Sequence, residues 1–163
     1  MDIQLIRIDD RLIHGQVAIT WAKDNRISRI IVVSDEVAAN PIQKTLLSQA
    51  APPGVKAHVI TLNKLIDIYM NPMLKDVKVM LLFTNPADVV TIYKNGINFQ
   101  TVNIGGMKFT DGKKMVTHFV SVNQEDIDAF KYLDQQGIEL EIRKVPSDRK
   151  QLLMDVLKKG SYI

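Results

Sequence analysis

The sequence predicts an α/β fold: a single open, mostly parallel β-sheet of about seven strands, with helices on both faces and one antiparallel edge strand. Two observations carry this prediction. Short apolar runs of strand length alternate along the chain with segments whose apolar residues recur at helical spacing. The runs Arg29–Val33 and Val79–Phe83 are rich in apolar residues on both faces, which is typical of parallel strands covered by helices on both sides.

The bulk composition indicates one ordinary globular domain. The chain has 163 residues, of which 46% are hydrophobic and 24% charged, and we expect residues 1–163 to form a single domain. It shows no signal-peptide pattern and no apolar run long enough to span a membrane. A net charge of +3, spread along the chain, is too weak to indicate nucleic-acid binding. The absence of cysteine excludes disulfides, thiolate zinc sites and a cysteine nucleophile.

Each predicted strand is a short run rich in β-branched and apolar residues. In chain order, strands are expected at Ile3–Ile8, Arg29–Val33, Lys56–Thr61, Val77–Leu82, Thr101–Ile104, Met115–Val120 and Glu139–Arg143. Helices are expected between them at Gly15–Asn25, Pro41–Ala50, Leu62–Met70, Pro86–Asn95, Gln124–Gln136 and Asp148–Lys158. Strand and helix therefore alternate over most of the chain.

Capping signals define several helix ends. Asn85-Pro86 opens one predicted helix, and Asn123, which is followed by acidic residues, opens another. Gly96 and Gly137 end these two helices, and Ser147-Asp148 is expected to cap the last one.

The alternation fails at one place, Gly105–Lys114. Two predicted strands follow each other there with only a glycine-containing loop between them. We therefore expect a hairpin or an antiparallel edge strand at this point.

Three predicted loops are candidates for a functional site. Ligands of open α/β sheets bind outside the carboxyl ends of the strands, and the loops at Asp9–Gly15, Thr84–Pro86 and Gly105–Asp111 follow such ends. The first loop contains the most reactive side chains, because two aspartates, Arg11 and His14 directly precede a glycine and a helix.

The side chains of this loop admit two interpretations. In the structural one, Asp10 and Arg11 form a solvated ion pair and His14 begins the helix. In the functional one, His14 is a nucleophile, because a free imidazole has a pKa of about 6.5 and is largely uncharged near neutral pH. Arg11 then bridges phosphoryl oxygens with its planar guanidinium. Asp9 or Asp10 orients the imidazole or holds an arginine in place.

A phosphoryl group on His14 would lie at the N-terminus of the next helix, against Gly15 and Gln16. Unpaired backbone N–H groups and the helix dipole favour an anion there. We expect Gly105-Gly106 to adopt a glycine-only backbone conformation that turns N–H groups toward the same anion, and Thr84 to offer its hydroxyl. A structural explanation also exists for each: a turn for the glycines, and helix-capping chemistry before Pro86 for Thr84.

The other features indicate neither a metal nor a cofactor. His58 and His118 lie within predicted strands, at a separation that gives no metal-ligand spacing, and we expect both to be structural. The chain has no phosphate-binding P-loop and no dinucleotide-binding glycine motif after its first strand. We therefore expect no metal and no cofactor.

The stretch Arg7–Val17, with the sequence Arg-Ile-Asp-Asp-Arg-Leu-Ile-His-Gly-Gln-Val, closely resembles the active-site segment of a known family. The family is the IIB component of the bacterial sugar phosphotransferase system, mannose/fructose/sorbose class. The resemblance extends over nearly the whole chain, in the segments Arg29–Asp35, Lys44–Leu47, Leu82–Pro86, Val102–Met107, Val120–Val122 and Asp126–Phe130.

The resemblance implies a fold, an activity and partners. The fold is an open, predominantly parallel sheet flanked by helices. His14 accepts a phosphoryl group from a IIA protein, with Asp10 and Arg11 as its immediate surroundings, and transfers it to a hexose bound by the membrane components IIC and IID. The protein is then cytoplasmic, associated with the inner face of the membrane through IIC and IID, and its IIA donor is expected to be a separate polypeptide. IIB components of the glucose, lactose and mannitol classes use phosphocysteine, which this chain lacks.

The sequence leaves several matters open. It does not distinguish among mannose, fructose, sorbose and an amino sugar, and it leaves the oligomeric state undecided, with a homodimer as one option. Two other functions are compatible with the same loops. One is a module that binds a phosphorylated metabolite without chemistry, and the other is a regulator controlled by its own phosphorylation.

Overall fold

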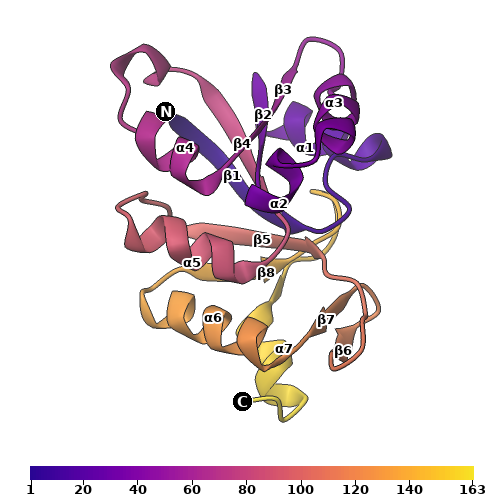
Figure 1. The fold of residues 1–163 in the computed structure, drawn as a ribbon. Coiled ribbons are helices and arrows are strands. Elements are labelled where there is room, and N and C mark those ends of the chain that lie inside the picture. Colours follow the sequence, from indigo (N-terminus) through magenta and orange to yellow (C-terminus); the bar gives the residue numbers. More distant parts are fainter.

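The computed structural model describes residues 1–163, and its central feature is one seven-stranded sheet (Figure 1). In spatial order its strands are β3 (Lys56–Ile60), β2 (Arg29–Val33), β4 (Lys78–Phe83), β1 (Asp2–Asp9), β5 (Thr101–Gly106), β8 (Glu139–Ile142) and β9 (Gln151–Leu152). All neighbours are parallel except at one edge, where β9 is antiparallel to β8. The predicted fold class is confirmed.

Helices cover both faces of this sheet. They are α1 (Gly15–Asp24), α2 (Asp35–Ala38), α3 (Pro41–Gln49), α4 (Leu62–Ile68), α5 (Pro86–Lys94), α6 (Gln124–Gln135) and α7 (Leu153–Lys159), with a 3-10 turn η1 (Pro72–Leu74). The first three bury apolar side chains on one face, which we call the α1 face, and α4 to α7 do so on the other. Figure 1 shows α1 and α3 on the opposite side of the sheet from α5 and α6.

The predicted signals at both ends of α5 and α6 are present in the structure. Asn85 Oδ1 accepts the backbone N–H of Asp88 at 2.9 Å at the start of α5. At the start of α6, Asn123 and Asp126 form a reciprocal capping box. Gly96 and Gly137 follow the two helices with φ angles of 92° and 83°, a left-handed conformation that favours glycine.

The predicted single strand Met115–Val120 is wrong. The segment forms a hairpin of β6 (Lys114–Thr117) and β7 (Val120–Val122), which make a separate two-stranded antiparallel sheet. The chain reverses where the Thr117 hydroxyl accepts the backbone N–H of Phe119 at 3.3 Å. No glycine, proline or asparagine marks this turn, so the sequence reads as one continuous strand.

The predicted start of the last helix at Asp148 is also wrong. The Asp148 carboxylate accepts the backbone N–H groups of Lys144 at 3.2 Å and Val145 at 3.3 Å, and so closes a turn that precedes it. The chain then forms β9, and α7 begins only at Leu153. The antiparallel edge strand of the main sheet is β9. The segment after Gly105, where we expected a hairpin or an antiparallel edge strand, forms the β6–β7 hairpin outside the main sheet.

One row of side chains crosses the α1 face at right angles to the strands. The register places one residue from each of six neighbouring strands in this cross-sheet row: Val59, Val32, Leu82, Arg7, Asn103 and Glu141. We call the first three the apolar half and the last three the polar half. All six are almost fully buried, and the boundary between the halves lies between β4 and β1.

The same boundary is the topological switch point of the sheet. The chain leaves β1 through α1 on the α1 face, and leaves β4 through α5 on the opposite face. Connections that diverge in this way open a crevice at the carboxyl ends of the two strands. The fold therefore places the loop after β1 where α/β proteins bind their ligands.

Candidate functional site

His14 lies at the junction between the loop after β1 and helix α1. It is the residue before the first turn of α1, and its side chain is 27% exposed. The buried side chains of Leu12 and Ile13 anchor the loop in the core of the α1 face. Leu12 has a φ of 63° and Gly15 a φ of 44°, so the backbone on both sides of the histidine is in the left-handed region. The loop is thus held in a conformation that few residues adopt, and the His14 side chain is partly exposed at its end.

Asp9, the last residue of β1, contacts the imidazole of His14. Asp9 Oδ2 lies 3.2 Å from His14 Nε2, and the Asp9 side chain is fully buried. Its two oxygens also accept the Arg7 Nη2 group at 2.9 Å and the Nε, Nη2 and backbone N–H groups of Arg11, each at 3.1 Å. One buried carboxylate therefore ties the histidine to both arginines.

The surroundings of Asp9 keep its carboxylate ionised. Burial by itself raises its pKa, but hydrogen bonds from Arg11 and the charge of Arg7 outweigh this, and the pKa lies below its ordinary value. Burial lowers the pKa of Arg7, although Asp9 opposes this effect. Because an ionised carboxylate only accepts hydrogen bonds, His14 Nε2 carries the hydrogen in this contact. The lone pair of the neutral ring is then on Nδ1.

The structure separates the two neighbouring aspartates that the sequence left as alternatives. Asp9 contacts His14, whereas Asp10 accepts the backbone N–H of Lys108 at 2.7 Å and fastens the chain after β5 to the His14 loop. Asp10 makes no hydrogen bond to His14 or Arg11. We expected Asp10 in the immediate surroundings of the histidine, and the carboxylate found there is Asp9. Alternating side-chain direction along β1 places Arg7 and Asp9 on the same face, a signal that the sequence contains.

Arg11 is the more accessible of the two arginines at the site. Its side chain is 46% exposed, so its guanidinium is anchored on Asp9 and still faces solvent. Helix α1 has no acidic side chain in its first turn, which leaves its N-terminal N–H groups without a competing negative charge. Gln16 lies in this first turn with its side chain exposed. Solvent-facing N–H groups and a guanidinium are thus gathered beside His14.

Gly105 and Gly106 are near the site, but the predicted reason for them is wrong. They lie inside β5, and neither has a positive φ. A Cβ atom at Gly105 would be 2.0 Å from Arg7 Cζ, and one at Gly106 would be 3.1 Å from Asp9 Oδ1. The two glycines therefore make room for the buried arginine and carboxylate, and they do not form an anion-binding turn.

Thr84 occupies the neighbouring loop, at the carboxyl end of β4. It is half-buried, and its hydroxyl accepts the side-chain N–H of Asn85 at 3.1 Å. It makes no hydrogen bond to His14. The structure thus places Thr84 at the same edge of the sheet as the histidine, with its hydroxyl in the capping region of α5.

A buried polar network that the sequence analysis missed lies behind Asp9. Arg7 Nη1 donates to Asn103 Oδ1, and Asn103 Nδ2 donates to Glu141 Oε1 at 3.1 Å. Arg143 in turn donates from Nε and Nη2 to the two oxygens of Glu141 at 2.9 and 3.0 Å. The ring of Trp21 in α1 covers this network, with Arg7 Cζ and Arg143 Cζ 5.3 and 5.4 Å from its centroid.

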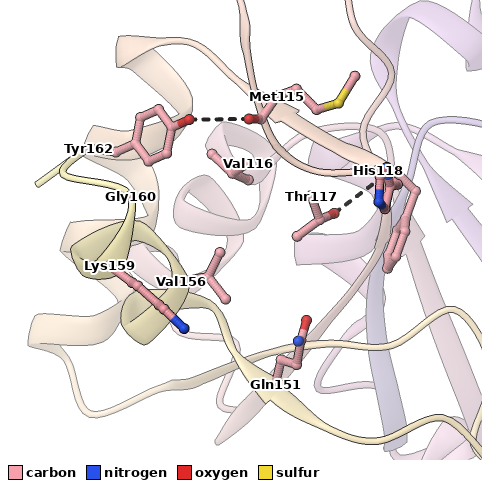
Figure 2. A pocket seen from close by; sticks show the side chains of 10 residues that line it. Met115, Val116, Thr117, His118, Gln151, Val156, Lys159, Gly160 and Tyr162 are labelled. Carbon is pink, nitrogen blue, oxygen red and sulfur yellow. Dashed lines mark hydrogen bonds between the residues drawn. The ribbon is translucent and has the colours of Figure 1, made fainter.

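The site is a surface feature and not a deep pocket. A hollow with a volume of about 620 Å³ lies between the β6–β7 hairpin and α7, and His14 does not line it (Figure 2). His118, Lys159 and Tyr162 are at its wall, and the Tyr162 hydroxyl donates to the Met115 carbonyl oxygen at 3.2 Å. No group of three or more histidine, cysteine or acidic side chains is arranged to hold a metal ion. No helix is long and apolar enough to cross a membrane.

Fold and site together define a doubly wound α/β domain with a partly exposed histidine at the switch point, backed by a buried carboxylate and two arginines. Comparison with known proteins agrees with this class. Residues 3–162 match the family model described as "PTS system sorbose subfamily IIB component", where PTS is the phosphotransferase system. The chain belongs to this family.

The relatives and solved structures are close. The chain is 56% identical over 159 residues to the mannose-specific EIIAB component of Escherichia coli K12, covering 98% of the chain and 49% of that protein. It is 42% identical to the fructose-specific EIIB component of Bacillus subtilis, covering 97% of both. The crystal structure of the IIBSor domain of the Klebsiella pneumoniae sorbose permease superposes with a TM-score of 0.97 at 45% identity, covering 100% of both chains. The chain thus spans about half the length of the mannose-specific relatives that it matches.

Proposed function

We propose that this chain is a phosphoryl carrier, in which His14 accepts a phosphoryl group from a phosphohistidine of a IIA unit and passes it to a hexose held by IIC and IID. It acts in the cytoplasm, at the inner face of the membrane through those components. The contact between His14 Nε2 and Asp9 Oδ2 carries this proposal, because it orients the ring and leaves Nδ1 without a hydrogen-bond partner. Membership of the IIB family supports it.

In the first step, the lone pair on His14 Nδ1 attacks the phosphorus of the donor. The new N–P bond forms as the N–P bond of the donor phosphohistidine breaks, and the donor ring keeps that electron pair. No hydroxyl is deprotonated, so the step needs no general base. The His14 ring becomes positively charged, and the ionised Asp9 beside Nε2 stabilises that charge. Catalysis is then mainly positioning and charge stabilisation.

The phosphoryl oxygens carry the negative charge in this transfer. Arg11 is suited to bind them, because its guanidinium is anchored on Asp9 and remains half exposed. The N-terminus of α1, with Gly15 and Gln16, supplies backbone N–H groups and the positive end of the helix dipole. Thr84 lies at the adjacent loop, from which its hydroxyl can contribute. This part of the site holds an anion without burying it, which suits a group that must be passed on.

In the second step the phosphoryl group leaves His14 for the sugar. The O–P bond to the sugar hydroxyl forms as the Nδ1–P bond breaks, and the hydroxyl proton passes to a base on the membrane component. The positively charged ring is a good leaving group, since it departs as the neutral imidazole with its hydrogen still on Nε2. Asp9 therefore serves both steps through one contact.

Protein partners can reach His14 because it stands on the surface. The loop after β5 lies beside it, fastened by the hydrogen bond from the Lys108 backbone N–H to the Asp10 carboxylate. Phe109 in this loop is 59% exposed. An exposed aromatic ring next to lysine and arginine side chains fits a partner that carries a phosphoryl group. We propose that the IIA donor docks over this loop and His14.

The substrate class rests on the relatives. Their names specify mannose, fructose and sorbose, and all of them match nearly the whole chain. We propose a hexose of this group, selected by the membrane components that bind it.

The test is covalent labelling. Incubated with phosphoenolpyruvate, the general phosphocarrier proteins and a IIA donor, the protein should gain one phosphate that is labile in acid and stable in base. His14→Ala should abolish labelling, and the control His118→Ala should retain it, because His118 is exposed in the turn between β6 and β7 and makes no hydrogen bond to His14, Asp9 or Arg11. Full labelling of His14→Ala would contradict the proposal.

The same experiment separates the two other functions. A module that only holds a phosphorylated metabolite binds it stoichiometrically and never becomes labelled. A regulator becomes labelled but does not transfer the phosphate to a sugar when membranes containing IIC and IID are added. The proposed carrier does both.

A further inference from the structure

Glu141 is a buried carboxylate two strands away from the His14 loop. It lies on β8 at the outer end of the polar half of the cross-sheet row, and its side chain is 2% exposed. Charged groups are costly to bury and are retained where they are paired and hydrogen-bonded. No step of the phosphoryl transfer touches Glu141, so its burial calls for another reason.

The partners of Glu141 lie in a line that leads to the site. Arg143 binds both of its oxygens from the outer side and remains partly exposed. On the inner side Glu141 Oε1 accepts only the side-chain N–H of Asn103. The two residues are neighbours in the β5–β8 register, so the sheet itself holds them opposite each other.

Glu141 determines which way the Asn103 amide points. An ionised carboxylate only accepts hydrogen bonds, so Asn103 turns its NH₂ group toward Glu141 and its carbonyl oxygen toward Arg7. The Asn103 NH₂ group also donates to the Arg143 carbonyl at 3.2 Å, which favours the same orientation. If the amide were rotated by half a turn, its NH₂ group would face the guanidinium of Arg7, a donor against a donor in a buried space.

The orientation of Asn103 in turn holds Arg7. The guanidinium of Arg7 is fixed through Nη1 by Asn103 and the Arg143 carbonyl, and through Nη2 by Asp9 and the Lys144 carbonyl. The Trp21 ring covers it. Arg7 thus fixes one oxygen of Asp9, and that oxygen, Oδ2, is the one that contacts His14 Nε2.

We propose that Glu141 is a positioning residue for His14: through Asn103 and Arg7 it holds Asp9 where that carboxylate orients the reacting imidazole. This role rests on the proposed phosphoryl transfer. It extends the functional site from the loop after β1 to β8, two strands away on the same face, and it makes β5 and β8 part of the site.

The test compares Glu141→Gln with Glu139→Gln in the intact chain. Both remove one carboxylate from β8, but Glu139 is exposed and pairs only with Lys150. With a phosphorylated IIA donor, Glu141→Gln should lower kcat about tenfold, the scale seen for residues that orient reactive groups from behind. The KM for the donor should stay unchanged, because Glu141 is away from the docking surface. Glu139→Gln should change neither constant.

A double variant tests the role of charge and orientation. Asn103→Asp combined with Glu141→Gln places the carboxylate next to Arg7 and an amide donor behind it, so Arg7 again has a fixed acceptor. We expect this pair to recover most of the lost kcat. A purely structural role of Glu141 predicts no recovery, because the ion pair with Arg143 is still missing.

A second single variant guards against failure to fold. Asn103→Ser interrupts the same line next to Arg7 and leaves the Glu141–Arg143 pair intact, and kcat should fall by a similar factor.

Nitrogen-15 NMR of the His14 ring gives a readout that does not depend on transfer: the share of the tautomer with hydrogen on Nε2 should fall in both single variants. Wild-type kcat and an unchanged tautomer in either folded variant would overturn the inference. Absence of labelling in the wild-type protein would instead overturn the proposed function, and the NMR measurement would still test the positioning role.

Discussion

The two halves of the cross-sheet row lie on the same face of the same sheet, and their chemistry is opposite. The apolar half is packed beneath α1 and α3, whereas the polar half carries charge and is covered by Trp21. Arg7 is the first residue on the polar side, and its neighbours in register are Leu82 on β4 and Asn103 on β5. The change from hydrocarbon to ions thus occurs between two adjacent strands, at the switch point.

This difference indicates a division of tasks. Burying a valine or leucine side chain stabilises a fold by about 1.5–3 kcal/mol, so the apolar half contributes directly to stability. A buried ionic network contributes little net stability, because desolvation offsets the attraction between the charges. It does fix the positions of its members, since every donor needs its acceptor. The apolar half therefore stabilises the sheet, and the polar half fixes the positions of the site residues.

The largest effect on phosphoryl transfer is expected at the inner end of the polar half. Asp9→Asn should lower the rate of phosphoryl transfer by about 100-fold, because the amide no longer dictates which ring nitrogen carries the hydrogen. The rate is measured in single-turnover labelling, with circular dichroism to verify folding. Asp10→Asn is the control and should have a much smaller effect, since Asp10 contacts only the Lys108 backbone. Equal effects of the two variants would contradict the role of Asp9.

The next largest effect on phosphoryl transfer is expected where a side chain is added beside the polar half. Gly105→Ala places a methyl group 2.0 Å from Arg7 Cζ in a buried space. We expect the free energy of unfolding to fall by about 3 kcal/mol, and transfer to slow because Arg7 is displaced. Gly106→Ala should do less, since its new Cβ meets Arg11 and Asp9 at 3.1 Å or more and Arg11 can move. Urea denaturation and labelling measure both, and a neutral Gly105→Ala would rule out the tight fit.

Truncation of a side chain in the apolar half should lower stability without changing activity. Leu82→Ala removes a buried side chain next to Arg7 and should lower the free energy of unfolding by about 2–5 kcal/mol. The transfer rate of the folded protein should stay near that of the wild type at a temperature below its unfolding transition. A tenfold slower rate in the folded variant would break the division between the halves.

The smallest effect on phosphoryl transfer is expected at His58. Its imidazole contacts an arginine, whereas the imidazole of His14 contacts a carboxylate. Its Nε2 lies 2.9 Å from Arg29 Nη1, and burial, followed by the charges of Arg29 and Lys56, lowers its pKa. Because the pKa of His58 is lower in the folded state than in the unfolded state, the unfolding free energy of the wild-type protein is highest above about pH 6.5, where the imidazole is neutral in both states. It decreases as the pH falls through the folded-state pKa, since the unfolded state binds the proton more tightly. His58→Gln should remove this pH dependence of the unfolding free energy and leave transfer unchanged. Slower transfer would show that His58 belongs to the site.

Local signals were sufficient to predict most of the fold. The main strands and helices were predicted from periodicity and caps to within a few residues, as at Arg29–Val33 and Pro86–Lys94. The errors fall where a side-chain hydrogen bond to the backbone closes a turn. Thr117 closes the β6–β7 hairpin, and Asp148 caps a turn instead of a helix. Such hydrogen bonds depend on which backbone groups are close in space, and no local pattern specifies that.

The candidate site was predicted only in part for the same reason. His14 and Arg11 were selected because they crowd one loop beside a helix start. The choice between Asp9 and Asp10 required the strand to be in place, since alternation along β1 turns Asp9 toward Arg7 and His14. The Gly105-Gly106 pair predicts a turn by local criteria, and its true reason is not local, because the close neighbour of these glycines, Arg7, belongs to a different strand.

By itself, the sequence determined the order of strands and helices, the position of His14 after the first strand and the absence of a competing thiol. These are local properties of the chain, and they were enough to predict an α/β domain with a reactive histidine. Only the tertiary structure decided what stands behind that histidine. Arg7 and Asn103 are 96 residues apart, and Asn103 and Glu141 a further 38. Parallel pairing brings them into one row, because strands from distant parts of the chain become neighbours only when the whole sheet forms.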